Sequence, residues 1–213
     1  MKGLIVKDIK IISKRAKFML IFLLIGVYMA YTSSAEFGVG YISMLGVMMS
    51  LGTITYDEYN NGYPFLMTFP CTIEEYVREK YIFCIASNAV FVLIGTAAIS
   101  VVKTVTGNAS ELGDIPIAAL GIFIAVCFVA FISIPVQIKF GGEKSKTALL
   151  VLYGIVVIAV AAVGYVIPKS LDIATLIDSI PISAGIIAGI VLGAAVTAIS
   201  YIISVKEMYK KFV

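Results

Sequence analysis

Long apolar stretches dominate this 213-residue sequence and restrict the folds that it can adopt. Charged residues make up only 14% of the chain, against roughly 25% in soluble domains. A helix needs about 20 apolar residues to cross about 30 Å of hydrocarbon. Six stretches come close to or exceed that length: residues 18–35, 37–56, 81–102, 115–138, 147–167 and 182–204. We therefore expect an all-α polytopic membrane protein with six transmembrane helices, formed by a single domain that covers residues 1–213.

The basic residues are distributed unequally between the segments that connect these spans. If the N-terminus lies inside the cell, the inner segments hold fourteen lysines and arginines, and the outer segments hold only Lys103 and Lys169. Cytoplasmic loops of membrane proteins carry an excess of lysine and arginine. The asymmetry predicts a multi-pass protein of the cell membrane with both termini in the cytoplasm. It also places residues 56–80 on the cytoplasmic side.

Residues 1–17 carry six basic residues and one acid, and their apolar residues recur at roughly helical spacing. This pattern is typical of an amphipathic helix that lies in the inner membrane interface with its lysines toward anionic lipid. The alternative is an ordinary basic flank that only orients the first span. Both interpretations place the N-terminus inside.

The segment from Tyr56 to Lys80 is the longest interruption of the apolar sequence. It holds five of the thirteen acids of the chain, together with many aromatic residues. Acidic side chains are poorly suited to anionic lipid heads, so a protein partner is the better expectation. The residues that we expect to dock on that partner are Asp57, Glu58, Tyr59, Asn60, Asn61, Tyr63, Phe65 and Phe69. The alternative is that the aromatic side chains rest on the inner membrane interface.

Two local patterns predict helices within this segment. Residues 72–75, Thr-Ile-Glu-Glu, fit a capping box, so we expect a helix that starts there and runs into the third span. Asp57 is expected to cap a short helix that begins at Glu58. Gly62 and Pro64 would limit that helix to about one turn or split it.

Several kinds of chemistry lack the residues that they require. The sequence has no histidine, which excludes Ser–His–Asp and Cys–His catalysis and most zinc sites. Cys71, Cys84 and Cys127 have no metal or redox spacing and are expected to be inert buried thiols. The sequence contains no phosphate-binding loop. The six predicted spans contain no charged residue, whereas ion-coupled transporters usually have a charged residue within a span. We therefore expect no enzymatic activity, no metal and no cofactor in this chain.

Uncharged residues within the spans have two interpretations each. Asn88 in the third span either lines a translocation path or hydrogen-bonds a neighbouring helix, and we favour helix packing. Gly185, Gly189 and Gly193 recur at four-residue intervals in the sixth span and form a groove that lets another backbone approach closely. The helix that fills this groove belongs either to the same chain or to a second copy.

Two strings resemble the type 2 ABC exporter permeases. The first runs from TYDE to FPCTIEEYVREKY between the second and third spans. Its residues that match the family are Asp57, Glu58, Pro70, Glu75, Tyr76, Val77, Lys80 and Tyr81. The second string is PVQIKFGGEK, residues 135–144, at the end of the fourth span. Within that family the chain is most similar to the small permeases of bacterial exporters of phenol-soluble modulins and bacteriocins.

The resemblance implies the permease subunit of an ATP-driven exporter. A separate cytoplasmic ABC ATPase would bind ATP and magnesium, and residues 57–69 would form the coupling helix that docks on it. A second permease copy, identical or related, would complete the membrane part in the lipid bilayer. The substrate would be hydrophobic or amphipathic, such as a peptide, and no nucleic acid is expected. The alternatives are an ion-coupled secondary transporter and a non-transporting membrane scaffold or assembly factor.

Overall fold

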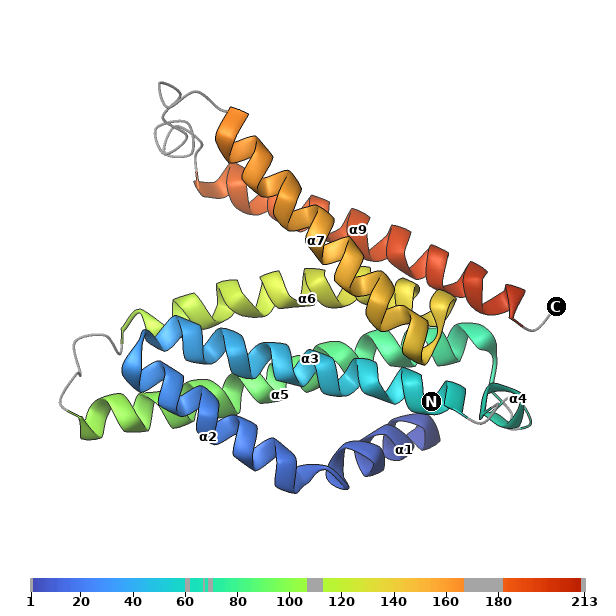
Figure 1. Cartoon of the computed structure of the whole chain (residues 1–213), viewed down its shortest axis with the longest axis horizontal. Helices are drawn as coiled ribbons and strands as arrows, with labels where there is room; N and C mark the ends of the chain where they lie inside the picture. Colours follow the sequence, from blue (N-terminus) through green and yellow to red (C-terminus); the bar gives the residue numbers. More distant parts are fainter. Residues whose placement is uncertain are drawn as a thin grey trace.

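Every regular element is a helix in the part of the chain that the computed structural model describes, residues 2–59, 62–66, 68, 71–106, 113–166 and 182–211. The helices are α1 (Lys2–Ser13), α2 (Ala16–Thr32), α3 (Ala35–Glu58), α4 (Gly62–Leu66), α5 (Ile73–Val105), α6 (Ile115–Phe140), α7 (Gly142–Val166) and α9 (Ile182–Lys210). Helices α3, α5 and α6 contact one another and form the centre of the bundle (Figure 1). Helices α1 and α2 lie on one side of this centre, and α7 and α9 lie on the other.

Three of the described helices, α3, α5 and α6, are long and apolar enough to cross a membrane. Helix α2 is also apolar but shorter, with 17 residues. The 33 residues of α5 extend over about 50 Å at about 1.5 Å per residue, so this helix reaches past an apolar layer of about 30 Å. The all-helical membrane fold is therefore confirmed, while the full set of six spans stays a prediction.

Hydrophobic contacts hold the three central helices together. One cluster surrounds Ile42 of α3 and Ile99 of α5, and a second surrounds Ile54 of α3 and Ile134 of α6. All four side chains are almost fully buried. Large apolar side chains remain exposed on the outer faces, among them Leu24, Leu93, Leu120 and Leu150. Exposed leucines at this density suit a surface that faces lipid, since apolar patches of this extent are rare on soluble monomers.

The turn between α2 and α3 differs from the predicted one. We expected it around Glu36, whereas α2 ends at Thr32 and α3 begins at Ala35, so that Glu36 lies in the first turn of α3. The Oγ of Ser34 caps α3 by accepting a hydrogen bond from the amide of Phe37 at 3.4 Å. A serine cap followed by an acid in the first turn stabilises a helix start at this place.

The helix expected after the capping box is confirmed. The Thr72 Oγ1 accepts from the amide of Glu75 at 3.2 Å, and the Glu75 Oε2 accepts from the amide of Thr72 at 3.2 Å. Helix α5 then continues without a break from Ile73 to Val105, through the third predicted span.

The short helix of residues 57–69 begins later than predicted. Helix α3 continues through Glu58 and ends with Tyr59 as its C-cap, and the short helix α4 starts only at Gly62. Pro64 lies in the first turn of α4, where its missing N–H is tolerated. The prediction that Asp57 caps a helix is therefore wrong, because its carboxylate binds groups on α1 and α5 instead.

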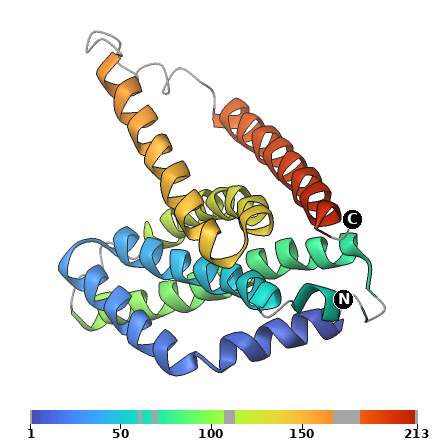
Figure 2. The ribbon, with the colours of Figure 1, turned by 45° about the vertical axis from the view of Figure 1, so that its right-hand side comes forward.

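Helices α7 and α9 both pack on α6, and Figure 2 shows them inclined in the same direction with a gap between the two ribbons. Helix α9 is also tied to α5, since the Tyr81 hydroxyl lies 2.5 Å from the Ser200 Oγ and 2.9 Å from the Ser204 Oγ. Both ends of the chain lie near α4 (Figure 1). We call this end of the bundle the α4 end. It is the predicted cytoplasmic side.

Candidate functional site at the α4 end

A group of buried charges joins α1, α3 and α5 at the α4 end. The Lys80 Nζ on α5 lies 2.5 Å from the Asp8 Oδ2 on α1 and 2.7 Å from the Asp57 Oδ2 on α3. Lys7 forms ion pairs with the same two acids, and its Nζ lies 3.2 Å from the Asp8 Oδ1. We call Lys7, Asp8, Asp57 and Lys80 the ionic cluster. Its two cations balance its two anions.

Two hydroxyl groups complete the ionic cluster. The Thr53 Oγ1 lies 3.0 Å from the Asp8 Oδ2 and accepts from the Lys80 Nζ at 3.1 Å. The Tyr76 hydroxyl donates to the Asp57 Oδ2 at 3.0 Å. All five of these side chains are at most 5% exposed. Removing one member of such a buried pair leaves the other charge uncompensated, at a cost of about 3–5 kcal/mol. The ionic cluster therefore fixes the end of α3 to α1 and to the start of α5.

Glu79 is a third buried acid beside the ionic cluster. Its side chain is completely buried, and its Oε2 lies 3.8 Å from the Lys80 Nζ. This is an ion pair without a hydrogen bond, and neither carboxylate oxygen has a hydrogen-bond partner in the described part of the chain. A buried charge is costly unless it is paired. Lys7 pairs with Asp8 and Asp57, whereas Lys80 lies within 4 Å of all three acids.

Glu58 occupies a different environment one residue beyond Asp57. Its side chain is 29% exposed, and its Oε1 accepts a hydrogen bond from the Nζ of Lys211 at 2.7 Å. Lys211 directly follows the last residue of α9. The carboxylate also lies against Gly141, where an added Cβ would be 2.7 Å from the Glu58 Oε2. Gly141 has a φ of 78°, which favours glycine. Glu58 thus connects the end of α3 to the α6–α7 turn and to the end of α9.

Tyr63 of α4 is buried and contacts Tyr76 and Lys211. It is 6% exposed and stands edge-on to Tyr76, with 6.0 Å between the ring centroids. The Lys211 Nζ lies 5.2 Å from the centre of the Tyr63 ring, a distance at which a cation is attracted by an aromatic face. Burial, together with the negative charge of Glu58, raises the pKa of the Tyr63 phenol. Tyr63 therefore anchors α4 to the bundle as a neutral side chain.

The eight residues expected to dock on a partner are not equally accessible. Asp57 and Tyr63 are buried, and Glu58 is paired within the chain. Tyr59 precedes α4 and Phe65 lies within it, and they are 73% and 66% exposed. The remaining three lie outside the described residues: Asn60, Asn61 and Phe69. Docking stays a prediction, and the two exposed aromatic side chains are better placed for direct contact than Asp57.

Sequence reasoning did not identify Asp8 and Lys80 as partners of Asp57. The sequence nevertheless contains a pattern that indicates the buried position of Asp8. Asp8 is the single acid among residues 1–17 and follows Leu4 by four positions. Residues four apart lie on one face of a helix, and both Leu4 and Asp8 are buried. An acid on the apolar face of an otherwise basic helix indicates a buried cation opposite. Lys80 gave no such indication, since a lysine beside a membrane span is ordinary.

Asn88 of α5 forms hydrogen bonds with two other helices, α3 and α6. Its Oδ1 accepts from the Ser43 Oγ on α3 at 2.7 Å. Its Nδ2 donates to the backbone oxygen of Phe123 at 3.3 Å and lies 3.4 Å from the Cys127 Sγ, both on α6. The side chain is completely buried. These contacts favour the helix-packing interpretation, and a place on the translocation path stays a prediction.

The cysteines differ in their burial. Cys84 and Cys127 are buried, as expected, whereas Cys71 is only partly buried. All three are free thiols. The expectation of buried thiols therefore holds for the two cysteines inside the bundle.

The glycines spaced four residues apart lie on α9. At Gly193 an added Cβ would lie 3.3 Å from the Cζ of Phe128 on α6, so this glycine packs within the chain. The surroundings of Gly185 and Gly189 lie outside the described side chains. A contact with a second copy through these two glycines stays a prediction.

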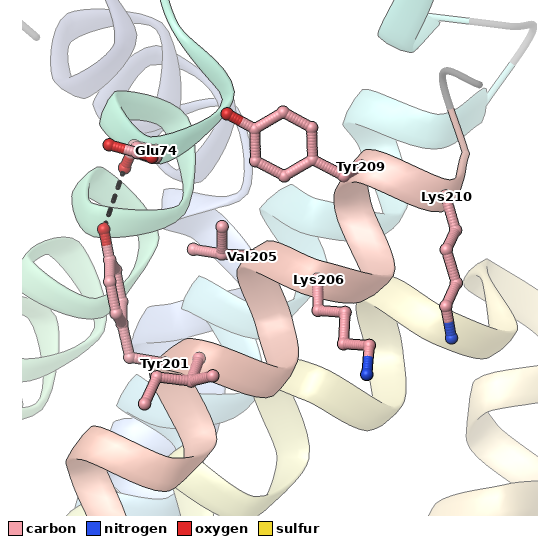
Figure 3. Close-up of a pocket in the computed structure, with 7 residues that line it drawn as sticks. Glu74, Tyr201, Val205, Lys206, Tyr209 and Lys210 are labelled. Carbon is pink, nitrogen blue, oxygen red and sulfur yellow. Dashed lines mark hydrogen bonds between the residues drawn. The ribbon is translucent and has the colours of Figure 1, made fainter.

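A surface cleft of about 740 Å³ lies between the first turn of α5 and the last turns of α9 (Figure 3). The residues that line it include Glu74 of α5 and, from α9, Tyr201, Val205, Lys206, Tyr209 and Lys210. The Tyr201 hydroxyl donates to the backbone oxygen of Glu74 at 3.5 Å. Charges of both signs and two tyrosines lie together here, which is typical of the polar rim of a protein interface.

The fold and its charged end define a polytopic membrane protein with a structured segment between two long apolar helices. The chain matches the ABC-2 family transporter protein family over residues 3–209, nearly its whole length. The chain belongs to this family: it is a permease subunit of an ABC transporter and works with an ABC ATPase. No curated protein and no solved structure matches the chain.

Proposed function

We propose that this chain is the permease of an exporter and that residues 57–69 dock on its ATPase through Tyr59 and Phe65. The observation that carries the proposal is the pair of exposed aromatic side chains beside α4, on a backbone held by buried ion pairs. Aromatic residues are enriched at the centres of protein interfaces. Because Tyr59 is the C-cap of α3 and Phe65 lies within α4, both side chains stand at folded helices, and docking would cost little conformational entropy at these two positions.

The contacts of α4 and its flanking residues provide a route for mechanical coupling. Asp57 binds α1 through Lys7 and α5 through Lys80, and Glu58 binds Lys211 beyond α9 and lies against Gly141 in the α6–α7 turn. A movement of the end of α3, from which the chain leads into α4, would therefore act directly on α1, on α5, on the α6–α7 turn and on the residue beyond α9. Nucleotide can shift the permease between two conformations only if the docked ATPase interacts differently with each, and this attachment supplies such a contact.

The substrate and the assembly belong to the same proposal. We infer that the transporter moves hydrophobic or amphipathic peptides outward and that two permease subunits form its membrane part. Supporting this are the strings at 55–81 and 135–144, which resemble those of type 2 ABC exporter permeases, and the similarity of the chain as a whole to the small permeases of peptide exporters. Membership of the ABC-2 family speaks against an ion-coupled secondary transporter and against a non-transporting scaffold.

The docking surface is tested by copurification of the ATPase with single Tyr59→Ala and Phe65→Ala variants and with their double variant. We expect the double variant to bind the ATPase at least about tenfold more weakly, equivalent to about 1.4 kcal/mol. The matched control is Tyr28→Ala, which alters a tyrosine on α2 that is 66% exposed and lies in the predicted outer half of the bundle. Undiminished ATPase binding by the double variant would show that these side chains rest on lipid. Substrate-stimulated ATP turnover tests the transport function itself.

A further inference from the structure

A second cavity, of about 550 Å³, lies between α3, α6 and the first turns of α7. Its size falls within the range of about 300–1,000 Å³ that is usual for ligand sites. The residues that carry the following argument are Arg15, Met48, Tyr56, Gln137, Lys146 and Leu149. No member of the ionic cluster lines this cavity, although Tyr59 lies at its rim. The cavity is therefore separate from the contacts that hold α4.

One end of the cavity is cationic. Arg15, at the junction of α1 and α2, donates to the Tyr56 hydroxyl, and its guanidinium carbon lies 4.8 Å from the centre of the Tyr56 ring. Lys146, from the start of α7, is exposed, and no ion pair joins it to any described residue. No carboxylate from the described residues lines the cavity. Two cations that face a cavity without a counter-charge favour an anionic ligand.

Gln137 of α6 supplies a polar group inside the same cavity. Its side chain is 6% exposed, and its amide nitrogen donates to the Thr55 Oγ1 at 2.7 Å. Its Oε1 has no hydrogen-bond partner in the described part of the chain. Buried acceptors normally have a donor, and a hydroxyl group on a bound ligand would provide one.

The other end of the cavity is apolar. Met48 and Leu51 line it from α3, and Leu149 lines it from α7. Met48 precedes Tyr56 by eight residues, which is about 12 Å along a helix at about 1.5 Å per residue. The cavity thus changes from cationic to apolar along the direction of α3. This polarity matches a ligand with an anionic head and a hydrocarbon tail.

We propose that this cavity binds the head and the first part of the acyl chains of an anionic phospholipid from the leaflet at the α4 end. Arg15 and Lys146 contact the phosphate, and Gln137 accepts a hydrogen bond from a hydroxyl group of the head. Met48 and Leu149 contact the start of the acyl chains, whose remainder stays in the bilayer. Phosphatidylglycerol combines a phosphate anion with hydroxyl donors in its head, and it is the occupant that we propose. Tyr59 lines this cavity and also belongs to the proposed docking surface, so the test below alters only residues outside that surface.

The test measures binding of phosphatidylglycerol to the full-length protein in a neutral detergent, by native mass spectrometry and by the shift in thermal unfolding temperature. We expect the double variant Arg15→Gln/Lys146→Gln to bind this lipid at least about tenfold more weakly than the parent. The control is Lys206→Gln/Lys210→Gln, which removes the same charge from α9. If both double variants lose binding of phosphatidylglycerol equally, the lipid is attracted by overall charge and not by this cavity, and the proposal is wrong.

Two further arms identify which part of the lipid is recognised. Gln137→Leu should weaken binding of phosphatidylglycerol but leave binding of phosphatidic acid, which lacks head hydroxyls, near that of the parent. Free glycerol phosphate should bind much more weakly than the lipid, because it makes no contact with the apolar end. If it binds as tightly as phosphatidylglycerol, or if a zwitterionic phosphatidylcholine does, the proposal is wrong.

Arg15→Lys, which keeps the charge, should retain most of the binding. A lipid-free unfolding temperature of the double variant equal to that of the parent shows that its loss of binding does not reflect unfolding.

Discussion

Lys80 and Asp8 form an ion pair with 2.5 Å between Nζ and Oδ2, although 72 positions separate them in the sequence. Both side chains are at most 2% exposed. The pair makes the basic N-terminal helix a part of the bundle, a contact that neither interpretation of residues 1–17, an interfacial helix or a basic flank, predicted. Helix α1 is thus positioned by a charge on α5, directly beside the residues expected to dock on the ATPase.

Loss of the Lys80 charge should destabilise the protein strongly. Lys80→Met leaves Asp8, Asp57 and Glu79 buried without their shared cation, so we expect a loss of about 3–5 kcal/mol. The measurement is thermal unfolding in detergent. Asp8→Asn should cost less, since the amide still forms hydrogen bonds. In the double variant with Lys80→Met, Asp8→Asn should lower the free energy of unfolding by less than it does in the parent protein.

The matched control for this series is Lys210→Met. The Lys210 side chain is 58% exposed, and among the described residues its ion pair is with Glu207 on the same helix, so its removal should change stability by less than about 0.5 kcal/mol. A parental unfolding temperature for Lys80→Met would mean that the ionic cluster does not hold α1 to the bundle.

The turn between α6 and α7 should not tolerate a side chain. Gly141 has a φ of 78°, and a Cβ at this position would meet the Glu58 carboxylate 2.7 Å from Oε2. We expect Gly141→Ala to cost at least about 1–2 kcal/mol. Adding Glu58→Ala should recover only part of that loss, because it removes the steric clash and not the backbone strain.

Gly121→Ala is the control for this substitution. Gly121 lies within α6, and no other atom lies within 4 Å of an added Cβ. Alanine is favoured over glycine inside a helix by about 0.5–1 kcal/mol, so this variant should be as stable as the parent or more so. Equal stability of Gly141→Ala and Gly121→Ala would contradict the described geometry of the turn.

Local patterns were predictable from the sequence, and distant contacts were not. The capping box at Thr72 joins residues three positions apart, so the sequence alone predicts the start of α5. The place of Asp57 depends on Lys80 and Asp8, which lie far away in the chain. Because these tertiary contacts decide where α3 ends, the predicted cap at Asp57 was wrong. The exposure of Tyr59 and the burial of Tyr63 likewise follow from packing and not from spacing.

The orientation in the membrane can be tested by labelling cysteines introduced on opposite sides. Ser145 is fully buried, so the exposed neighbour Lys144 is the better probe for the α4 end. Thr106 is exposed at the opposite end of α5. In a background without the three native cysteines, Thr106→Cys should react from outside the cell, and Lys144→Cys only after permeabilisation. The reverse pattern would place α4 outside and exclude docking on a cytoplasmic ATPase.

The role of Glu58 can be resolved by exchanging charges with Lys211. In the native protein the Glu58 Oε1 and the Lys211 Nζ form an ion pair at 2.7 Å. Glu58→Lys replaces this pair with two lysines side by side. We expect this variant to bind the ATPase about fivefold more weakly, equivalent to about 1 kcal/mol, because the end of α3 that precedes α4 loses its attachment to Lys211 beyond α9. Membrane insertion should be unchanged, since the added charge increases the existing asymmetry.

Adding Lys211→Glu to Glu58→Lys restores an ion pair of reversed polarity within the chain. If Glu58 acts by positioning α4, the double variant should recover most of the ATPase binding, and copurification in one detergent measures it. If Glu58 instead contacts a basic residue of the ATPase, the added lysine still repels that residue and the double variant stays deficient. The coupling between the two substitutions therefore distinguishes a positioning residue from a docking residue.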